Sequence, residues 1–198
     1  MSSRTSQLVL LACWTPLIRA RSGLLHPQDS ESREVKDLGG LWRFRADKDG
    51  TGLRDHWYRD GLPSPTIAMA VPSSYNELTQ DWALREHVGI VWYQRDFFVP
   101  LHWMTRRVVL YIGSANHHAI LWLNGQRVGE HEGGHLPFHV PLAPTVCSFG
   151  KSNRLVIALN NTLSTTTIPP GFTQVRPHPG TPTTHASATG RTTNTLSG

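Results

Sequence analysis

The fold of this chain is decided by the stretch Gly113-Ser-Ala-Asn-His-His-Ala-Ile-Leu-Trp-Leu-Asn-Gly-Gln-Arg-Val-Gly-Glu-His-Glu-Gly-Gly-His-Leu-Pro-Phe-His139. Residues 119–123 are apolar at every position, which is typical of a strand buried on both faces. Asn124-Gly125 supplies the two positive φ angles of a type I′ turn, so residues 126–130 are predicted to return as the partner strand. Gly133-Gly134 lets the backbone leave the sheet, and Pro137-Phe138 begins a new extended segment.

Further strands are predicted on both sides of this hairpin. In residues 41–45, Trp42 and Phe44 alternate with arginines, as in an antiparallel strand with one solvated face. Three more segments are rich in β-branched and other apolar residues: 88–99, 108–112 and 155–160. Short strands separated by Gly, Pro, Asn and Asp predict an all-β fold, an antiparallel two-sheet sandwich.

Helix is predicted to be a minor component. The best candidate is residues 77–86, which offer three apolar side chains for packing: Leu78, Trp82 and Leu84. A single helical turn within residues 55–60 would press Trp57 onto the sheet, although the segment is short for a helix.

Several motifs, in this order along the chain, resemble the N-terminal domain of animal β-glucuronidases of glycoside hydrolase family 2: Gly40–Asp47, Trp57–Arg59, Val71–Asn76, Gly89–Arg95, Gly113–Ala115, Glu130–Phe138 and Ile157–Leu163. The resemblance runs from Leu24 to Gly171. It implies a jelly roll of the galactose-binding-like kind and, for the whole family member, hydrolysis of β-D-glucuronides from glycosaminoglycans and conjugates. Family members are homotetramers, an assembly that this portion need not form.

The resemblance also implies what this chain does not carry. In the family, the catalytic glutamates come from a barrel far downstream of this region, so we expect a truncated β-glucuronidase-like protein with an incomplete jelly roll, no catalytic residue of its own and no cofactor. Two other interpretations stay open: a secreted carbohydrate-binding module, and a truncation product without a function.

The net charge of +5 does not indicate a nucleic-acid partner. Five arginines lie in the first 22 residues or after residue 171, and the 14 Lys and Arg between them are balanced by all 14 Asp and Glu. The predicted domain, residues 23–171, is therefore formally neutral and has no basic face for a polyanion. Its length suits one domain with a real core.

Residues 1–22 resemble a secretory signal peptide, with Arg4 before an apolar run and small residues near Ser22. The run is too short to span a bilayer. Its removal would take Cys13 away and leave Cys147 as the single cysteine, so no intrachain disulfide is expected. A lysosomal or secreted protein is the expectation; the alternative is that these residues form a buried N-terminal strand.

Residues 172–198 are mostly Thr, Pro, Gly, His and Ser, and are predicted to be a disordered tail that forms no strand. An O-glycosylated stalk is the alternative. A jelly roll pairs its late strands with early ones, and this tail is predicted to supply no late strand. We therefore expect exposed sheet edges, unburied side chains in residues 155–159, and a marginally stable fold.

Four groups of residues are candidates for chemistry. Glycoside hydrolysis needs two opposed carboxyl groups, and Glu130 and Glu132 are the one close pair in a predicted loop, where a solvated role is favoured over catalysis. Three histidines are spaced four residues apart and would line up as metal ligands on a helix: His131, His135 and His139. The glycines and the proline among them exclude that helix. The adjacent His117 and His118 would point to opposite faces of a strand.

Trp92, Tyr93 and Trp122 could form a stacking platform for a sugar, although aromatic residues that alternate in a sandwich strand are more often core. Asn160-Asn-Thr162 is an acceptor triplet for N-glycosylation at a predicted strand end. Carbohydrate is thus the partner class kept open, and Asn160 is the predicted site of modification.

Overall fold

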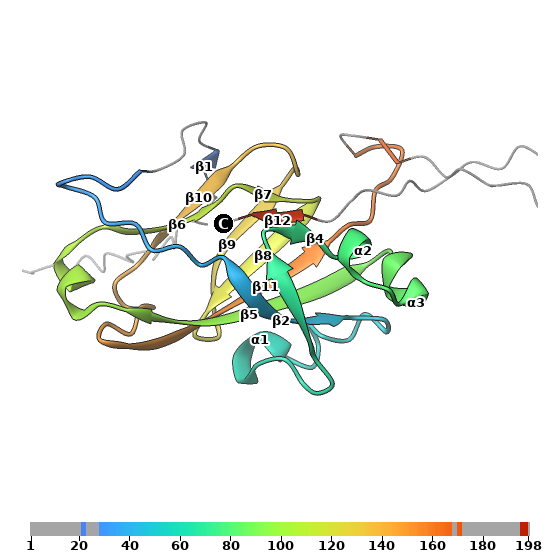
Figure 1. Cartoon of the computed structure of the whole chain (residues 1–198), viewed down its shortest axis with the longest axis horizontal. Coiled ribbons are helices and arrows are strands. Elements are labelled where there is room, and N and C mark those ends of the chain that lie inside the picture. The colour runs from blue at the N-terminus through green and yellow to red at the C-terminus, as the bar shows by residue number, and fades with distance from the viewer. Residues whose placement is uncertain (1–20, 23–27, 168–169, 172–194, 198) are drawn as a thin grey trace, which may run out of the picture.

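The structure is a computed structural model that describes residues 21–22, 28–167, 170–171 and 195–197. Its strands pair antiparallel throughout, which confirms the predicted all-β sandwich (Figure 1). The larger sheet has six strands in this order: β3 (Ile67–Val71), β2 (Gly40–Ala46), β5 (Ile90–Val99), β11 (Lys151–Asn160), β8 (His118–Leu123) and β9 (Gln126–Glu132). The three-stranded sheet is β1 (Arg21–Ser22), β10 (Phe138–Leu142) and β6 (Val108–Ile112).

A second three-stranded sheet joins β4 (Ser73–Ser74), β12 (Thr195–Ser197) and β7 (Ser114–Ala115). The helical segments among the described residues are short: α1 (Trp57–Asp60), α2 (Tyr75–Leu78), α3 (Trp82–Arg85) and the 3-10 helix η1 (Leu101–Thr105). None of the described helices is long and apolar enough to cross a membrane.

β11 is the centre of the larger sheet. It pairs with β5 along its whole length and with β8 over its second half. Every side chain from Leu155 to Leu159 is buried, because odd positions face the main core and even positions face the opposite side of the sheet. The expectation that residues 155–159 leave unburied apolar side chains is therefore wrong, because β5 and β8 flank the strand and an apolar cluster covers each face of the sheet.

The main core lies between the two sheets. Trp42 and Phe44 of β2 point inward, as their alternation predicts, and meet Leu110 of β6 and Phe138 of β10 from the other sheet. The ring of Phe44 lies edge-on to that of Tyr93, with centroids 4.9 Å apart. Such aromatic contacts add to the free energy of burial.

A smaller apolar cluster covers the outer face of the six-stranded sheet. The helical turn predicted in residues 55–60 is α1, and it places Trp57 against Trp92, with ring centroids 5.8 Å apart. Trp92 in turn stacks on Trp122 of β8. This cluster explains why residues on both faces of β5 and β8 are apolar.

The predicted hairpin is confirmed. Asn124 and Gly125 have φ angles of 52° and 80°, the two positive values that a type I′ turn requires. The Asn124 side chain accepts a hydrogen bond from the backbone N–H of Arg154 and donates to Asn153 Oδ1. The turn is thus anchored to the start of β11.

The predicted helix over 77–86 is wrong as a single element. The chain forms α2 and α3 instead, separated by extended residues around Thr79. The Asp81 carboxylate accepts from the N–H of Ala83, so it starts a new helix rather than continuing the first. Of the three side chains expected to pack, Leu84 is buried, whereas Leu78 and Trp82 are 54% and 71% exposed.

The two predicted end segments are described only in part. Residues 1–20 lie outside the described residues, and Arg21–Ser22 form β1 on the edge of β10. Of residues 172–198, the structure describes 195–197, which pair as β12 with β4 and β7. The expectation that nothing after Gly171 forms a strand is wrong for these three residues, because two nearby strand edges supply the backbone partners that the sequence of the tail does not reveal.

Candidate functional site

Glu130 and Glu132 lie on β9, so the prediction that they belong to a loop is wrong. Each contacts a histidine at the start of the hairpin: His118 is the first residue of β8, and His117 directly precedes it. The Glu130 Oε1 lies 2.7 Å from His118 Nε2, and its other oxygen is bound by the Arg127 guanidinium. The hydrogen bond with His118, followed by the charge of Arg127, holds the pKa of Glu130 below its ordinary value.

Glu132 Oε1 lies 3.4 Å from His117 Nε2, and the Glu132 side chain is 70% exposed. Neither glutamate lines the cavity between segment 31–38 and β6 or the smaller one beside Arg154. The lowered pKa of Glu130 makes its carboxyl a poor proton donor near neutral pH. Glu130 therefore pairs with His118 and Arg127, Glu132 lies in a looser contact with His117, and the two carboxylates do not face each other across a cleft.

The structure separates the other histidine candidates. His131 stacks on Phe138, with ring centroids 4.1 Å apart, and burial lowers its pKa. His139 lies on the neighbouring strand β10 opposite Tyr111, and His135 is exposed in the connecting loop. Among the described residues, no three His, Cys, Asp or Glu side chains are grouped as metal ligands.

The aromatic candidates are core residues, as the sequence favours. Trp92 and Tyr93 are fully buried, and Trp122 is nearly so. Burial raises the pKa of the Tyr93 hydroxyl. Trp92 Nε1 donates a hydrogen bond of 3.2 Å to Asp47 Oδ2. Trp92 and Trp122 pack in the cluster that holds Trp57 of α1, whereas Tyr93 packs in the main core. None of the three rings presents a face to a sugar.

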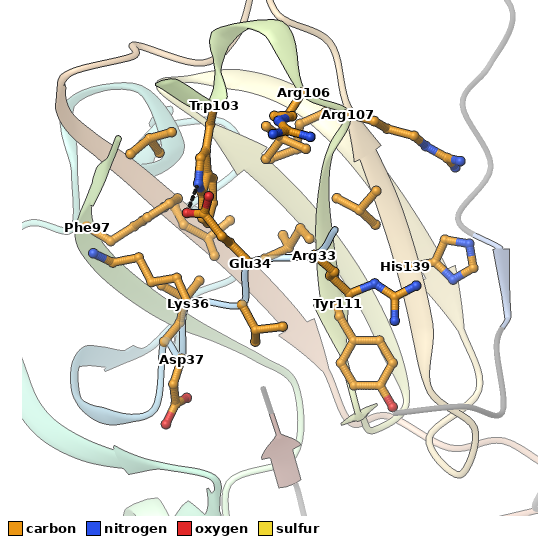
Figure 2. A pocket seen from close by; sticks show the side chains of 18 of the residues that line it. Arg33, Glu34, Lys36, Asp37, Phe97, Trp103, Arg106, Arg107, Tyr111 and His139 are labelled. Carbon is orange, nitrogen blue, oxygen red and sulfur yellow. Dashed lines mark hydrogen bonds between the residues drawn. The ribbon is translucent and has the colours of Figure 1, made fainter. Parts of the chain in front are cut away.

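One cavity of the described residues has a volume of about 880 Å³ (Figure 2). One wall is the segment 31–38 that leads into β2, and the opposite wall is β6. The floor consists of buried core residues from the larger sheet, namely Trp42, Val99 and Leu155. No residue of segment 31–38 was a candidate from the sequence, although Val35 and Leu38 are apolar positions in an otherwise charged run and could have indicated a covering segment.

The carboxylates of this cavity all come from one wall: Glu31, Glu34 and Asp37. Figure 2 shows the Glu34 side chain directed at Trp103, whose Nε1 donates a 2.7 Å hydrogen bond to it. His102 Nε2 lies 2.8 Å from the same carboxylate. The hydrogen bonds with Trp103 and then His102 lower the pKa of Glu34. The cavity thus has no carboxyl groups opposed across it, and its other wall carries Arg106, Arg107, Tyr111 and His139.

Asn160, the predicted glycosylation site, is the last residue of β11. Its side chain is half-buried, and its Oδ1 accepts a 2.9 Å hydrogen bond from the Thr162 N–H. The neighbouring Asn161 is buried and donates to the hydroxyl of Tyr75. The two adjacent asparagines therefore differ: Asn161 holds the fold together, whereas Asn160 lies at the surface end of the strand.

Residues 35–168 match the family described as "Glycosyl hydrolases family 2, sugar binding domain". A β-glucuronidase of Homo sapiens is 47% identical over 171 residues, which cover 81% of this chain and 26% of the relative. A β-glucuronidase of Paenibacillus borealis is 49% identical over 148 residues, which cover 75% of this chain and 24% of the relative. The resemblance thus extends to bacterial as well as animal proteins.

Solved structures agree with these relatives. A β-glucuronidase of an uncultured Clostridium sp. matches with a TM-score of 0.71 and 41% identity over 76% of this chain and 26% of its own. One from Ruminococcus gnavus matches with the same TM-score and 33% identity over 77% of this chain and 25% of its own. This chain spans about a quarter of the length of the relatives that it matches. It belongs to glycosyl hydrolase family 2, with residues 35–168 as a sugar binding domain like that of the β-glucuronidases.

Proposed function

We propose that this chain is the non-catalytic, N-terminal portion of a β-glucuronidase. In this proposal, cleavage of β-glucuronides takes place in the part of the relatives that this chain does not span, and the jelly roll contributes a folded unit on which that part assembles. The relatives are named β-glucuronidases and share 47–49% of aligned residues with this chain, which supports the proposal.

The observation that supports a non-catalytic role for this chain is the position of its carboxylates. A glycosidase holds two carboxyl groups on opposite sides of the scissile bond, about 5–5.5 Å apart when it retains configuration. Here Glu130 is bound by His118 and Arg127 on the surface of β9, and the acids of the large cavity share one wall. Neither arrangement can place a proton donor and a nucleophile on either side of a sugar.

A chimera tests the proposal directly. Residues 35–168 replace the matching segment of the Homo sapiens β-glucuronidase, and hydrolysis of a fluorogenic β-glucuronide is measured. We expect the chimera to fold and to hydrolyse the substrate, because about half of the positions are identical and the core positions follow the same fold. Residues 1–198 alone are expected to give no hydrolysis above the blank.

Two outcomes would contradict the proposal. A chimera with a cooperative thermal transition but no hydrolysis would show that this portion does not replace its counterpart. Hydrolysis by residues 1–198 that disappears in Glu130→Gln, but not in the matched Glu77→Gln variant on α2, would show that the chain has a catalytic carboxylate of its own.

Carbohydrate binding without catalysis is the alternative function. Its support is the description of the matched family as a sugar binding domain. A glycan array with the purified chain distinguishes it: specific binding that depends on Tyr111 or Trp103 in the large cavity would favour this alternative. Burial of Trp92, Tyr93 and Trp122 leaves these three rings out of any such site.

The proposed route of the chain is the secretory pathway, towards a lysosomal or secreted location, with Asn160 glycosylated. The apolar run in residues 8–18 and the position of Asn160, half-buried at the end of β11, support it. In mammalian cells, Asn160→Gln should lose one endoglycosidase-sensitive gel shift, whereas Asn194→Gln should not, because Asn194-Thr-Leu is not an acceptor triplet. Recovery of a cytosolic product that retains residues 1–22 would contradict the proposed route.

A further inference from the structure

A second cavity, of about 410 Å³, lies where the hairpin turn meets α1 and the first residues of β11; we call it the hairpin cavity. Every residue that lines it is polar or charged: Arg59, Asp96, Asn124, Ser152, Asn153 and Arg154. Its volume is at the lower end of the range of about 300–1,000 Å³ that is usual for small-molecule sites. The hairpin cavity therefore has the size for one small polar ligand.

The walls of the hairpin cavity are held in place without a ligand. The buried Asn153 accepts hydrogen bonds at Oδ1 from Asn124 Nδ2 and from the N–H of Ser148, and its Nδ2 donates to the Ser148 carbonyl. Gly125 packs against the backbone of α1, since a Cβ on it would lie 3.4 Å from Arg59 Cα. These contacts join the turn, β11 and α1, so a ligand would meet a preformed site.

The charges of the hairpin cavity do not balance. Arg154 Nε lies 3.3 Å from Asp96 Oδ1, and Arg154 Nη1 donates a 2.9 Å hydrogen bond to the Asp60 carbonyl. Arg59 takes part in none of the ion pairs found among the described residues. The lining thus contains two arginines and one carboxylate, and that carboxylate is already paired. One positive charge is left over, which favours an anion and disfavours a cation.

The available donors indicate the kind of anion. A guanidinium presents parallel N–H groups that match two oxygens of a carboxylate or sulfate. The Ser152 hydroxyl is on an exposed residue of the same lining and offers a further donor. Asp96 keeps acceptor capacity for a hydroxyl group of the ligand, because an ionised carboxylate has about four acceptor positions.

We propose that the hairpin cavity is an anion-binding site for a carboxylate or sulfate group, with Arg59 as its main counter-charge. Arg154 and Ser152 supply the second side of the site. Such a group belongs either to an acidic sugar or to a free inorganic anion, and the experiment separates these two sources. The inference does not depend on the proposed function, since none of these residues has a role there.

The experiment uses the full chain labelled with ¹⁵N and follows backbone amide shifts during titration. D-galacturonate and D-galactose are the matched probes, because they differ only in the carboxylate at C6, and inorganic sulfate is the third. Galacturonate should shift the amides of Gly125, Ser152 and Arg154 and leave those of the edge strand β3 unchanged. Galactose should bind about tenfold more weakly or less, because it lacks the charge that pairs with Arg59.

A matched pair of arginines tests the assignment of Arg59. Arg54 is also exposed but lies outside the cavity, where it pairs with Asp55. Arg59→Gln should weaken galacturonate binding by about tenfold or more, whereas Arg54→Gln should leave it within about twofold. Arg59→Lys should fall between the wild type and Arg59→Gln, because lysine keeps the charge and loses the parallel N–H groups.

Asp96→Asn gives a change of the opposite sign. Removal of this carboxylate leaves the charge of Arg154 unneutralised, so galacturonate should bind about threefold more tightly at low salt. A purely structural role of Asp96 would weaken binding or leave it unchanged. Each variant is compared with the wild type by its amide spectrum, and the exposed Arg59 is a position at which the fold should tolerate glutamine.

Four outcomes would overturn the inference. They are an absence of shifts at the hairpin cavity with both galacturonate and sulfate, equal binding of galacturonate and galactose, equal effects of Arg59→Gln and Arg54→Gln, and weaker binding by Asp96→Asn. Sulfate that binds as tightly as galacturonate, and loses its affinity in Arg59→Gln, would support the site and assign it to a free inorganic anion. Sulfate that binds more weakly than galacturonate would support the site and assign it to an acidic sugar.

Discussion

Asp47 is a residue on which a whole corner of the fold depends. It is buried, and its carboxylate accepts hydrogen bonds from the N–H groups of Thr51 and Gly52 and from Trp92 Nε1. We expect Asp47→Ala to lower the free energy of unfolding by about 2–3 kcal/mol, because three donors lose their acceptor. Urea titration of tryptophan fluorescence measures the change.

Asp47→Asn and Lys48→Ala are the controls for this prediction. The amide keeps one acceptor oxygen, so its effect should be smaller than that of alanine, and the exposed Lys48 should give a change within about 0.5 kcal/mol. Equal stability of the wild type and Asp47→Ala would show that the three donors find other acceptors.

Glu130 gives a prediction with a defined pH dependence. Its pKa in the folded chain is below the ordinary value of 4.5. The stabilisation is therefore fully present above pH 4.5 and is lost as the pH falls through the lowered pKa. We expect Glu130→Gln to be less stable than the wild type near pH 6, by at most about 1 kcal/mol for such a partly exposed pair, and equal to it in strong acid.

Thermal unfolding at several pH values measures this difference, with Glu77→Gln as the control because Glu77 is an exposed residue of α2. A difference between the wild type and Glu130→Gln that grows as the pH falls would contradict the assigned direction of the pKa shift.

At the scale of elements, β11 is the strand whose packing matters most. Ile157 on β11 is fully buried, whereas Ile67 on the edge strand β3 is 46% exposed. Ile157→Ala should destabilise the chain by about 2–5 kcal/mol, and Ile67→Ala by much less, because the same atoms are removed from very different surroundings. Chemical denaturation of the two variants side by side tests the order; similar losses would mean that β11 is not the packed centre of the sheet.

The hairpin and the helical region differ in how far the sequence predicts them. Asn124-Gly125 determines its turn locally, so β8 and β9 could be identified in advance. The region 77–86 could not, because the Asp81 cap breaks the helix and the sheet does not offer a surface to Trp82. Helices of this length gain their stability from tertiary contacts rather than from their own residues.

For the whole molecule, Cys147 is a reporter of global unfolding. It is the free cysteine of the described residues, it is buried in the main core, and burial raises the pKa of its thiol. In a Cys13→Ser variant, we expect a thiol-reactive disulfide reagent to label Cys147 slowly in buffer, and faster with urea in parallel with the loss of tryptophan fluorescence. Rapid labelling in buffer would show that the core around Cys147 opens without global unfolding.

The marginal stability expected for the isolated portion stays a prediction. The expected cause, unburied side chains in residues 155–159, is wrong, since the strand is buried on both faces. The edge of β6 that no other described strand pairs with is a different reason to expect a marginal fold, because its backbone groups lack strand partners.

The sequence alone determined the local features of this protein. Alternation predicts the inward side chains of β2, the Asn-Gly pair predicts the hairpin, and the ordered motifs predict the family, because each of these signals is contained in a few neighbouring residues. It also favoured core positions for Trp92, Tyr93 and Trp122. A glycosylated Asn160 and a secretory leader stay predictions.

Only the tertiary structure decided how these elements meet. The place of β11 between β5 and β8, the contacts of Glu130 and Glu132 with histidines, the pairing of β12, and the cavity beside β6 all depend on residues that lie apart in the chain. Strand order and register are set by the best burial of many side chains at once, and no short stretch of sequence contains that information.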